Sequence, residues 1–195
     1  MGLSATDLTP TPSQTVGPYF HLGCTERHAV SRIAGSNAQG DRVRLICQVL
    51  DGDGMPVDDA MIEIWQADSD GRYNHPMGEN ANDNDPHCTG FGRLAVGANG
   101  VCIFETIKPG RVPADAGQLQ APHLNVSVFA RGVLKQLVTR IYFADEPANQ
   151  ECPILSLVPP ERRSTLMARP DTQNPGDWHF AIHLCGKNET VFFDV

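Results

Sequence analysis

Short segments in which hydrophobic and polar residues alternate recur along the chain, and this pattern restricts the possible fold most strongly. In residues 42–50, RVRLICQVL, every second residue is hydrophobic: Val43, Leu45, Cys47 and Val49. Successive side chains of a β-strand point to opposite faces, so this segment is predicted to be a strand with one buried face. By similar patterns, further strands are predicted at 60–67, 101–107, 123–130, 136–144 and 178–184.

Turn sequences separate these segments and favour a mainly β fold. DGDG at 51–54 and DSDG at 68–71 are turns, and the first predicts that 42–50 and 60–67 form a hairpin or lie side by side. The chain contains 18 glycines and 15 prolines, which favours many turns and short strands over long helices. About eight short strands with long loops and one or two short helices predict a β-sandwich.

Two other secondary-structure predictions concern the C-terminal part of the chain. Residues 159–169, PPERRSTLMAR, are the best helix candidate, because Pro160 suits a first helical turn and Glu161 lies near the positive end of the helix dipole. The segments 178–184 and 190–195 are predicted to form a hairpin across CGKNE.

The length of 195 residues fits a single domain spanning 1–195. Within it, residues 1–20 are predicted to be an extended N-terminal arm, because prolines and glycines interrupt any regular element there. Residues 74–92 form a long polar loop with few core-forming side chains, and loops of that length in compact domains are often functional.

Charge and cysteine content restrict the classes of partner. The net charge of −8 disfavours non-specific binding to nucleic acid or to an anionic membrane. There is no hydrophobic run near the ~20 residues that span a bilayer, and no hydrophobic signal segment at the N-terminus. The six cysteines are widely spaced without a CxxC pair, so we expect reduced thiols in a cytoplasmic protein.

Among the seven histidines, His123 is the candidate for metal binding. Residues i and i+2 of a strand share a face about 6.6 Å apart, so a second histidine at 125 could bind the same ion, but Asn125 is a poor ligand for a transition metal. His179 and His183 would lie about 13 Å apart and are predicted to be ordinary surface residues. The residues alone leave open a metal site, the remains of one, or a strand that contains a histidine.

Several blocks of sequence resemble the intradiol ring-cleaving dioxygenases. They are TPSQTVGPY, IEIWQADSDGRY, TIKPG, APHLN, FARG, TRIYFADE and ETVFFD, and they occur in the family's order from about Thr11 to the C-terminus. The resemblance implies the intradiol type of β-sandwich and a role in opening a catechol ring with O2.

The same resemblance implies that this chain does not hold iron by itself. Iron-bearing members of the family bind Fe(III) through two tyrosinates and two histidines, at positions that fall here on Tyr73, Val112, His123 and Asn125. Fe(III) is a hard cation that favours anionic oxygen donors, and a valine cannot ligate it. These four positions therefore resemble a degenerate metal site.

Two further positions depart from the iron-bearing pattern, and they exchange residue types. The arginine that the iron-bearing chain has three residues before its first histidine is replaced by Gln120, and the glutamine of its TRIYF block is replaced by Arg140.

Within the family, the blocks resemble an iron-free α chain whose homologous β chain holds Fe(III), in a large α/β oligomer. The implied substrates are protocatechuate (3,4-dihydroxybenzoate) and O2, giving 3-carboxy-cis,cis-muconate for the β-ketoadipate pathway. The implied contributions of this chain to the substrate pocket are Arg131 and, from the arm, Thr15, Gly17, Pro18 and Tyr19. A planar guanidinium such as that of Arg131 suits the substrate carboxylate.

Two alternatives remain open at this point. The chain could be a self-sufficient iron dioxygenase that uses Tyr73 and His123 with further ligands such as His75 or His87. It could instead be a non-enzymatic β-sandwich binding module, such as a carbohydrate or transport domain, which predicts a monomer without affinity for an iron-bearing chain.

Overall fold

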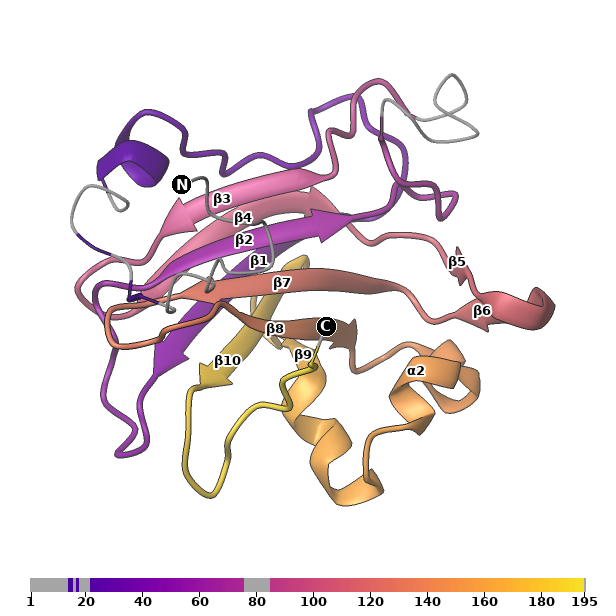
Figure 1. The fold of residues 1–195 in the computed structure, drawn as a ribbon. Coiled ribbons are helices and arrows are strands. Elements are labelled where there is room, and N and C mark those ends of the chain that lie inside the picture. Colours follow the sequence, from indigo (N-terminus) through magenta and orange to yellow (C-terminus); the bar gives the residue numbers. More distant parts are fainter. Residues whose placement is uncertain (1–13, 16, 18–21, 76–84, 195) are drawn as a thin grey trace, which may run out of the picture.

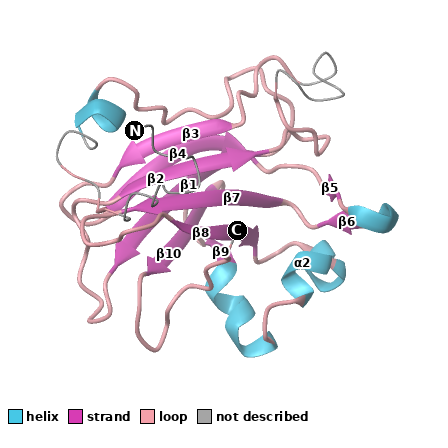
Figure 2. Ribbon diagram, viewed as in Figure 1, coloured by secondary structure: helices cyan, strands magenta, loops and turns pink. Residues whose placement is uncertain are grey.

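The computed structural model describes residues 14–15, 17, 22–75 and 85–194 of the chain (Figure 1). Strands dominate these residues, and the few helices are short and lie at the periphery of the sheet (Figure 2). The mainly β prediction is therefore confirmed. No helix within the described ranges is long and hydrophobic enough to cross a bilayer.

Eight strands form one continuous sheet in the order β3-β2-β7-β8-β9-β10-β1-β4. Their bounds are β1 Arg42–Leu50, β2 Met61–Gln66, β3 Phe91–Ala95, β4 Val101–Ile107, β7 His123–Phe129, β8 Leu137–Phe143, β9 Met167–Pro170 and β10 Asp177–His183. A separate two-stranded sheet pairs β5, Val112–Pro113, with β6, Leu119–Gln120.

The helices are single turns or little more. They are η2 Leu22–Glu26, η3 Asp115–Gly117, η4 Pro147–Glu151, α2 Pro153–Ser156 and η5 Pro160–Leu166. Of these, η4, α2 and η5 follow one another in the chain beside β8 and β9 (Figure 1).

Strand β9 joins the two halves of the sheet, because it pairs with β8 in parallel and with β10 antiparallel. The main hydrophobic core lies between these halves and draws side chains from both, including Leu45 and Phe180 from one half and Ile64, Val126 and Ile141 from the other. Burying a side chain of this size contributes about 2 kcal/mol. The alternation seen in 42–50 and 178–184 places every second residue in this core.

A segment before β1 brings the two edge strands of the sheet together. The Val30 amide donates to the Arg93 carbonyl of β3, and the Ile33 amide donates to the Glu105 carbonyl of β4. Gly92 of β3 faces the side chains of Ile33 and Phe104, and a Cβ added there would come within 2.7–2.9 Å of them. The sheet is nearly closed as a result.

The structure corrects several element predictions. The segments 42–50 and 60–67 are strands, but they lie in different halves of the sheet and do not pair. The helix predicted over 159–169 is present as a 3-10 helix over 160–166, but 167–170 is strand β9. The predicted C-terminal hairpin is also wrong, because Phe193 bridges to Val138 of β8. Strand β3 begins at Phe91, inside the region predicted to be a loop.

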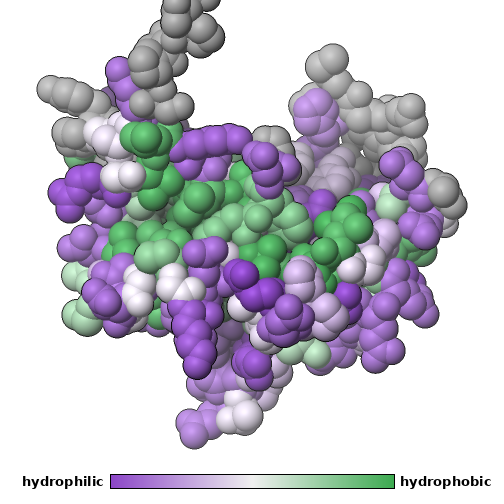
Figure 3. All heavy atoms as spheres, turned by 60° about the horizontal axis from the view of Figure 1, so that its bottom comes forward, coloured by the Kyte–Doolittle hydropathy of each residue, from purple (hydrophilic) through white to green (hydrophobic). Residues whose placement is uncertain are grey.

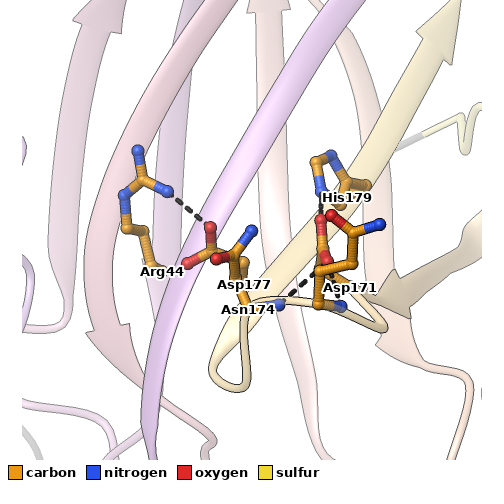
Figure 4. Close-up of polar contacts among 6 residues, drawn as sticks. Arg44, Asp171, Asn174, Asp177 and His179 are labelled. Carbon is orange, nitrogen blue, oxygen red and sulfur yellow. Dashed lines mark hydrogen bonds and ion pairs between the residues drawn. The ribbon is translucent and has the colours of Figure 1, made fainter.

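The turn between β9 and β10 shows how the surface histidine His179 is held (Figure 4). The ring Nε2 of His179 lies 3.0 Å from Oδ2 of Asp171, and Oδ1 of Asp171 accepts from the Asn174 amide at 3.0 Å. At the other end of the turn, Arg44 Nη1 donates to Asp177 Oδ2 at 2.6 Å. The half-exposed side chain of His179 agrees with its prediction as a surface residue.

Candidate functional site

Strand β7 carries predicted site residues at its two opposite ends. His123 is its first residue, next to β6, and Arg131 follows its last residue in the connection to β8 (Figure 1). Six residue steps separate His123 from Phe129, which corresponds to about 20 Å at a rise of ~3.3 Å per residue. The residues predicted to bind substrate therefore lie far from the degenerate metal positions of the same chain.

Tyr73 is held at the degenerate site by the turn after β2. The buried Asp68 side chain accepts hydrogen bonds from the amides of Asp70 and Arg72, both at 2.9 Å, which fixes the path of the chain into Tyr73. The Tyr73 ring stacks on Trp65 of β2 with a centroid distance of 6.1 Å. This packing leaves the phenol hydroxyl facing β7.

A chain of hydrogen bonds joins Tyr73, His123 and Asn125. His123 Nδ1 lies 2.8 Å from the Ala121 carbonyl oxygen, so Nδ1 carries the proton and donates to it. The Tyr73 hydroxyl can then donate to Nε2 of His123 at 3.3 Å while accepting from Asn125 Nδ2 at 2.9 Å. Every member of this chain is electrically neutral, and each polar atom named has a partner.

The other positions place the hydrocarbon side chain of Val112 and the positive charge of Arg140 beside these hydrogen-bonded residues. Val112 is buried and pairs with Gln120 through β5 and β6. Gln120 Oε1 accepts from Arg140 Nη1 at 2.7 Å, and Arg140 stands opposite Asn125 in the β7–β8 register. The exchanged arginine and glutamine therefore bind each other.

The electrostatics of the site disfavour a bound cation. Burial and, to a smaller extent, the charge of Arg140 lower the pKa of His123 to about 4, so the imidazole is neutral at pH 7. Burial raises the pKa of Tyr73, although the Asn125 hydrogen bond and the Arg140 charge oppose this rise. In the site as it stands, without a bound metal, the phenol is therefore protonated at pH 7 and acts as a hydrogen-bond donor.

These residues do not fit Fe(III). Only Tyr73 and His123 keep a donor suited to the ion, while Asn125 directs its NH2 group at the phenol oxygen. Within the described residues no three His, Cys, Asp or Glu side chains form a metal-binding group, so His75 and His87 do not complete one with His123.

At the other end of β7, the structure brings two predicted substrate-binding residues together. The Val133 amide donates to the Ala130 carbonyl at 3.2 Å, and Gly132 has φ +86°, which defines a tight turn with Arg131 at its exposed corner. The Gly132 amide donates to Thr15 Oγ1 at 2.7 Å, so the arm is attached beside Arg131. Gly17, two residues after Thr15, is exposed to solvent. Pro18 and Tyr19 lie outside the described residues.

Sequence reasoning missed Asp59, which contacts Arg131. Asp59 Oδ2 lies 3.1 Å from Arg131 Nε. The signal for this contact is the β2–β7 register, which pairs Met61 with Phe129 and continues to 59 and 131. That signal is invisible in the sequence because it requires the strand pairing to be known.

A hollow of about 600 Å³ lies on the outer face of β1 and β10, away from all of these residues. Its lining includes Ile46, Arg169, His179 and His183, and none of the predicted site residues. Size alone therefore does not identify the site, and the hydrogen-bonded clusters at the ends of β7 define it better.

Comparison with known proteins identifies relatives of the whole chain. Residues 15–186 match the dioxygenase family. The chain is 44% identical over 203 residues to the protocatechuate 3,4-dioxygenase alpha chain of Burkholderia cepacia, covering 97% of this chain and 100% of that one. It is 33% identical to the protocatechuate 3,4-dioxygenase beta chain of the same organism, covering 84% of this chain and 73% of that one.

A solved structure supports the same assignment at the level of the fold. The dioxygenase domain of a dioxygenase and carbohydrate-binding fusion protein from Streptomyces sp. SirexAA-E superposes with a TM-score of 0.62 at 25% identity, covering 91% of this chain and 99% of that one. The predicted intradiol type of β-sandwich is confirmed.

Proposed function

Because the chain belongs to the intradiol dioxygenase family, we propose that it is the α chain of a protocatechuate 3,4-dioxygenase. With a homologous β chain it converts 3,4-dihydroxybenzoate and O2 into 3-carboxy-cis,cis-muconate, a step of the β-ketoadipate pathway. Both oxygen atoms enter the product as the ring opens between its two hydroxyl-bearing carbons.

The observation that carries this proposal is the separation of the two clusters along β7. Arg131 and Thr15 lie about 20 Å from Tyr73 and His123 when measured along the strand. A substrate held by Arg131 is therefore out of reach of the degenerate site in the same chain. In this proposal the binding residues face a reaction centre on another chain.

Fe(III) belongs to the β chain in this proposal, since the donors at Tyr73, Val112, His123 and Asn125 do not fit it. The uncovered hydrophobic surface between hydrophilic side chains in Figure 3 supports assembly with a second chain, because such surfaces often mark protein interfaces. The proposal includes a large α/β oligomer, a single domain over 1–195, and a cytoplasmic location in which the six free cysteines stay reduced.

The residues of this chain bind and orient the substrate. Arg131 offers two parallel N–H donors to the carboxylate, which fixes the ring position and distinguishes protocatechuate from plain catechol. Thr15 holds the turn that presents Arg131. Gly17, Pro18 and Tyr19 are proposed to line the pocket from the arm, where a glycine and a proline give a restricted backbone that can approach a ligand closely.

The two alternatives from the sequence lack support. A self-sufficient iron enzyme needs four donors, whereas Val112 has none and Asn125 directs its NH2 group at Tyr73. A non-enzymatic binding module disagrees with relatives that are dioxygenase chains over nearly the full length.

The decisive experiment replaces Arg131 in the co-expressed α/β complex. Arg131→Ala should raise KM for protocatechuate about tenfold or more, because a charge-assisted bidentate contact is lost, while the iron content of the complex stays unchanged. Steady-state kinetics and metal analysis measure both quantities. Arg169→Ala, an exposed arginine on β9, is the matched control. An unchanged dependence of the rate on protocatechuate contradicts the proposed role.

A further inference from the structure

The contact between Asp59 and Arg131 is built by the strand register. Strands β2 and β7 are antiparallel, with Met61 opposite Phe129, and continuing this register two residues beyond the strands places Asp59 opposite Arg131. Ala60 and Ala130, the residues just before and after these strands, are almost fully buried. The backbone positions of the two charged residues are therefore fixed by packed neighbours.

The contact uses the Nε side of the guanidinium, and within the described residues no ion pair occupies its other side. Asp59 Oδ2 lies 3.1 Å from Nε of Arg131, and the Arg131 side chain is 79% exposed against 32% for Asp59. An arginine fork presents its two Nη groups on a separate edge, which matches a carboxylate. An ion pair through Nε thus restricts the rotamers of Arg131 without occupying that edge.

A second contact fixes the backbone under Arg131. The Gly132 amide donates to Thr15 Oγ1 at 2.7 Å. Gly132 has φ +86°, a backbone conformation that would be strained in a residue with a side chain. The main chain at the corner is thus held from the arm, and the side chain is held from the start of β2.

We propose that Asp59 is a positioning residue for Arg131, which holds the guanidinium in the orientation that binds the substrate carboxylate. This inference rests on the proposed function, because it requires Arg131 to contact the substrate. Asp59 itself touches neither the substrate nor the reacting atoms. Its contribution is to reduce the rotamer freedom that Arg131 loses on binding.

The size of the effect follows from the exposure of the pair. An exposed ion pair is weak, so losing it should change substrate binding by about two- to fivefold rather than by orders of magnitude. The direction depends on two opposing effects. The Asp59 carboxylate repels an anionic substrate, but water and salt screen that repulsion. The orientation of the Arg131 guanidinium, in contrast, directly determines its contact with the substrate carboxylate. We therefore expect binding to weaken when Asp59 is neutralised.

The test uses the α/β complex with Asp59→Asn. KM for 3,4-dihydroxybenzoate should rise about two- to fivefold at unchanged kcat and iron content. With 4-methylcatechol, which has a methyl group in place of the carboxylate, the variant should match the wild type. Asp59→Glu keeps the charge and should recover part of the lost affinity. A purely structural role for Asp59 would affect both substrates alike.

The matched control is Asp58→Asn, which removes the same charge from the exposed neighbouring residue. An unchanged or lowered KM in Asp59→Asn, or an equal change in Asp58→Asn, overturns the inference. If Arg131→Ala raises KM and Asp59→Asn does not, only the positioning role fails. If Arg131→Ala also leaves KM unchanged, the proposed function of this cluster fails with it.

Discussion

At the scale of single residues, the degenerate site is a set of neutral, mutually satisfied polar groups rather than an empty metal centre. Asn125, Tyr73 and His123 pass hydrogen bonds in one direction and end on the Ala121 carbonyl. Buried polar groups that have partners stabilise a unique packing, whereas the same groups without partners are costly. These hydrogen bonds thus give Tyr73, His123 and Asn125 a structural role.

His123 should make the stability of the chain depend on pH. Its pKa is about 4 in the folded state against 6.5 in the unfolded state, so only the unfolded state takes up a proton between these values. The contribution of His123 to the free energy of unfolding is therefore fully present above pH 6.5. It is lost as the pH drops toward 4, by on the order of 3 kcal/mol. Urea unfolding between pH 4.5 and 7.5 measures this change.

The variant His123→Asn should have a flatter stability profile over this range, although its stability at pH 7 is lower because two hydrogen bonds are lost. His28→Asn, at an exposed position, serves as the control and should follow the wild type. Parallel profiles for His123→Asn and the wild type would show that another group causes the loss of stability in acid.

At the scale of elements, the segment 30–35 is as important for the sheet as the regular strands. It bonds to β3 through Val30 and to β4 through Ile33, and it thereby closes the gap between the two edges. Unpaired sheet edges invite pairing with other chains, so this segment also protects them. Its residues make only isolated bridges, which explains why no strand pattern marks it in the sequence.

Gly92 should not tolerate a larger side chain, because its Cβ position is already occupied by Ile33 and Phe104. Gly92→Ala is expected to lower the free energy of unfolding by about 1–3 kcal/mol through overpacking of the core. Chemical denaturation measures this change in the free energy of unfolding. Gly23→Ala, where nothing lies within 4 Å of the added atom, should change stability by about 0.5 kcal/mol or less. Similar values for the two variants would show that the sheet closure is loose.

At the scale of the whole molecule, the chain combines a complete dioxygenase fold with an incomplete set of metal ligands. The fold match covers 91% of the chain, so the dioxygenase framework is intact. The 33% identity to a β chain shows that such a framework exists in two related versions. We infer that one version keeps the metal and the other contributes to its pocket.

The chain prepared without a β chain should therefore be colourless and inactive, even after incubation with Fe(III). The Tyr73 hydroxyl lies within hydrogen-bond distance of His123, and the raised pKa of Tyr73 opposes formation of the tyrosinate that would give a ferric complex its visible absorption. An absorption spectrum and metal analysis test this. Co-expression with a β chain should give a coloured, active complex. A coloured and active single chain would contradict the division of roles between the two chains.

Six of the strands and the family could be predicted from the sequence alone, whereas β3 and β9 could not. Alternation in 42–50 and 178–184 is a local property and was sufficient to place strands. The family blocks also supplied Arg131 and Thr15 as candidates. The helix predicted at 159–169 is present over 160–166 but gives way to a strand at Met167, and the C-terminal hairpin prediction is wrong, because Met167 and Phe193 pair with β8.

Only the tertiary structure decided which strands pair and how the candidates group. It placed Arg131 and His123 at opposite ends of β7, attached Thr15 to Gly132, and brought Asp59 to Arg131 across 72 residues of sequence. These relations depend on strand register and on contacts between distant segments. Local patterns fix which face of a strand is buried, but they do not fix which strand lies beside it.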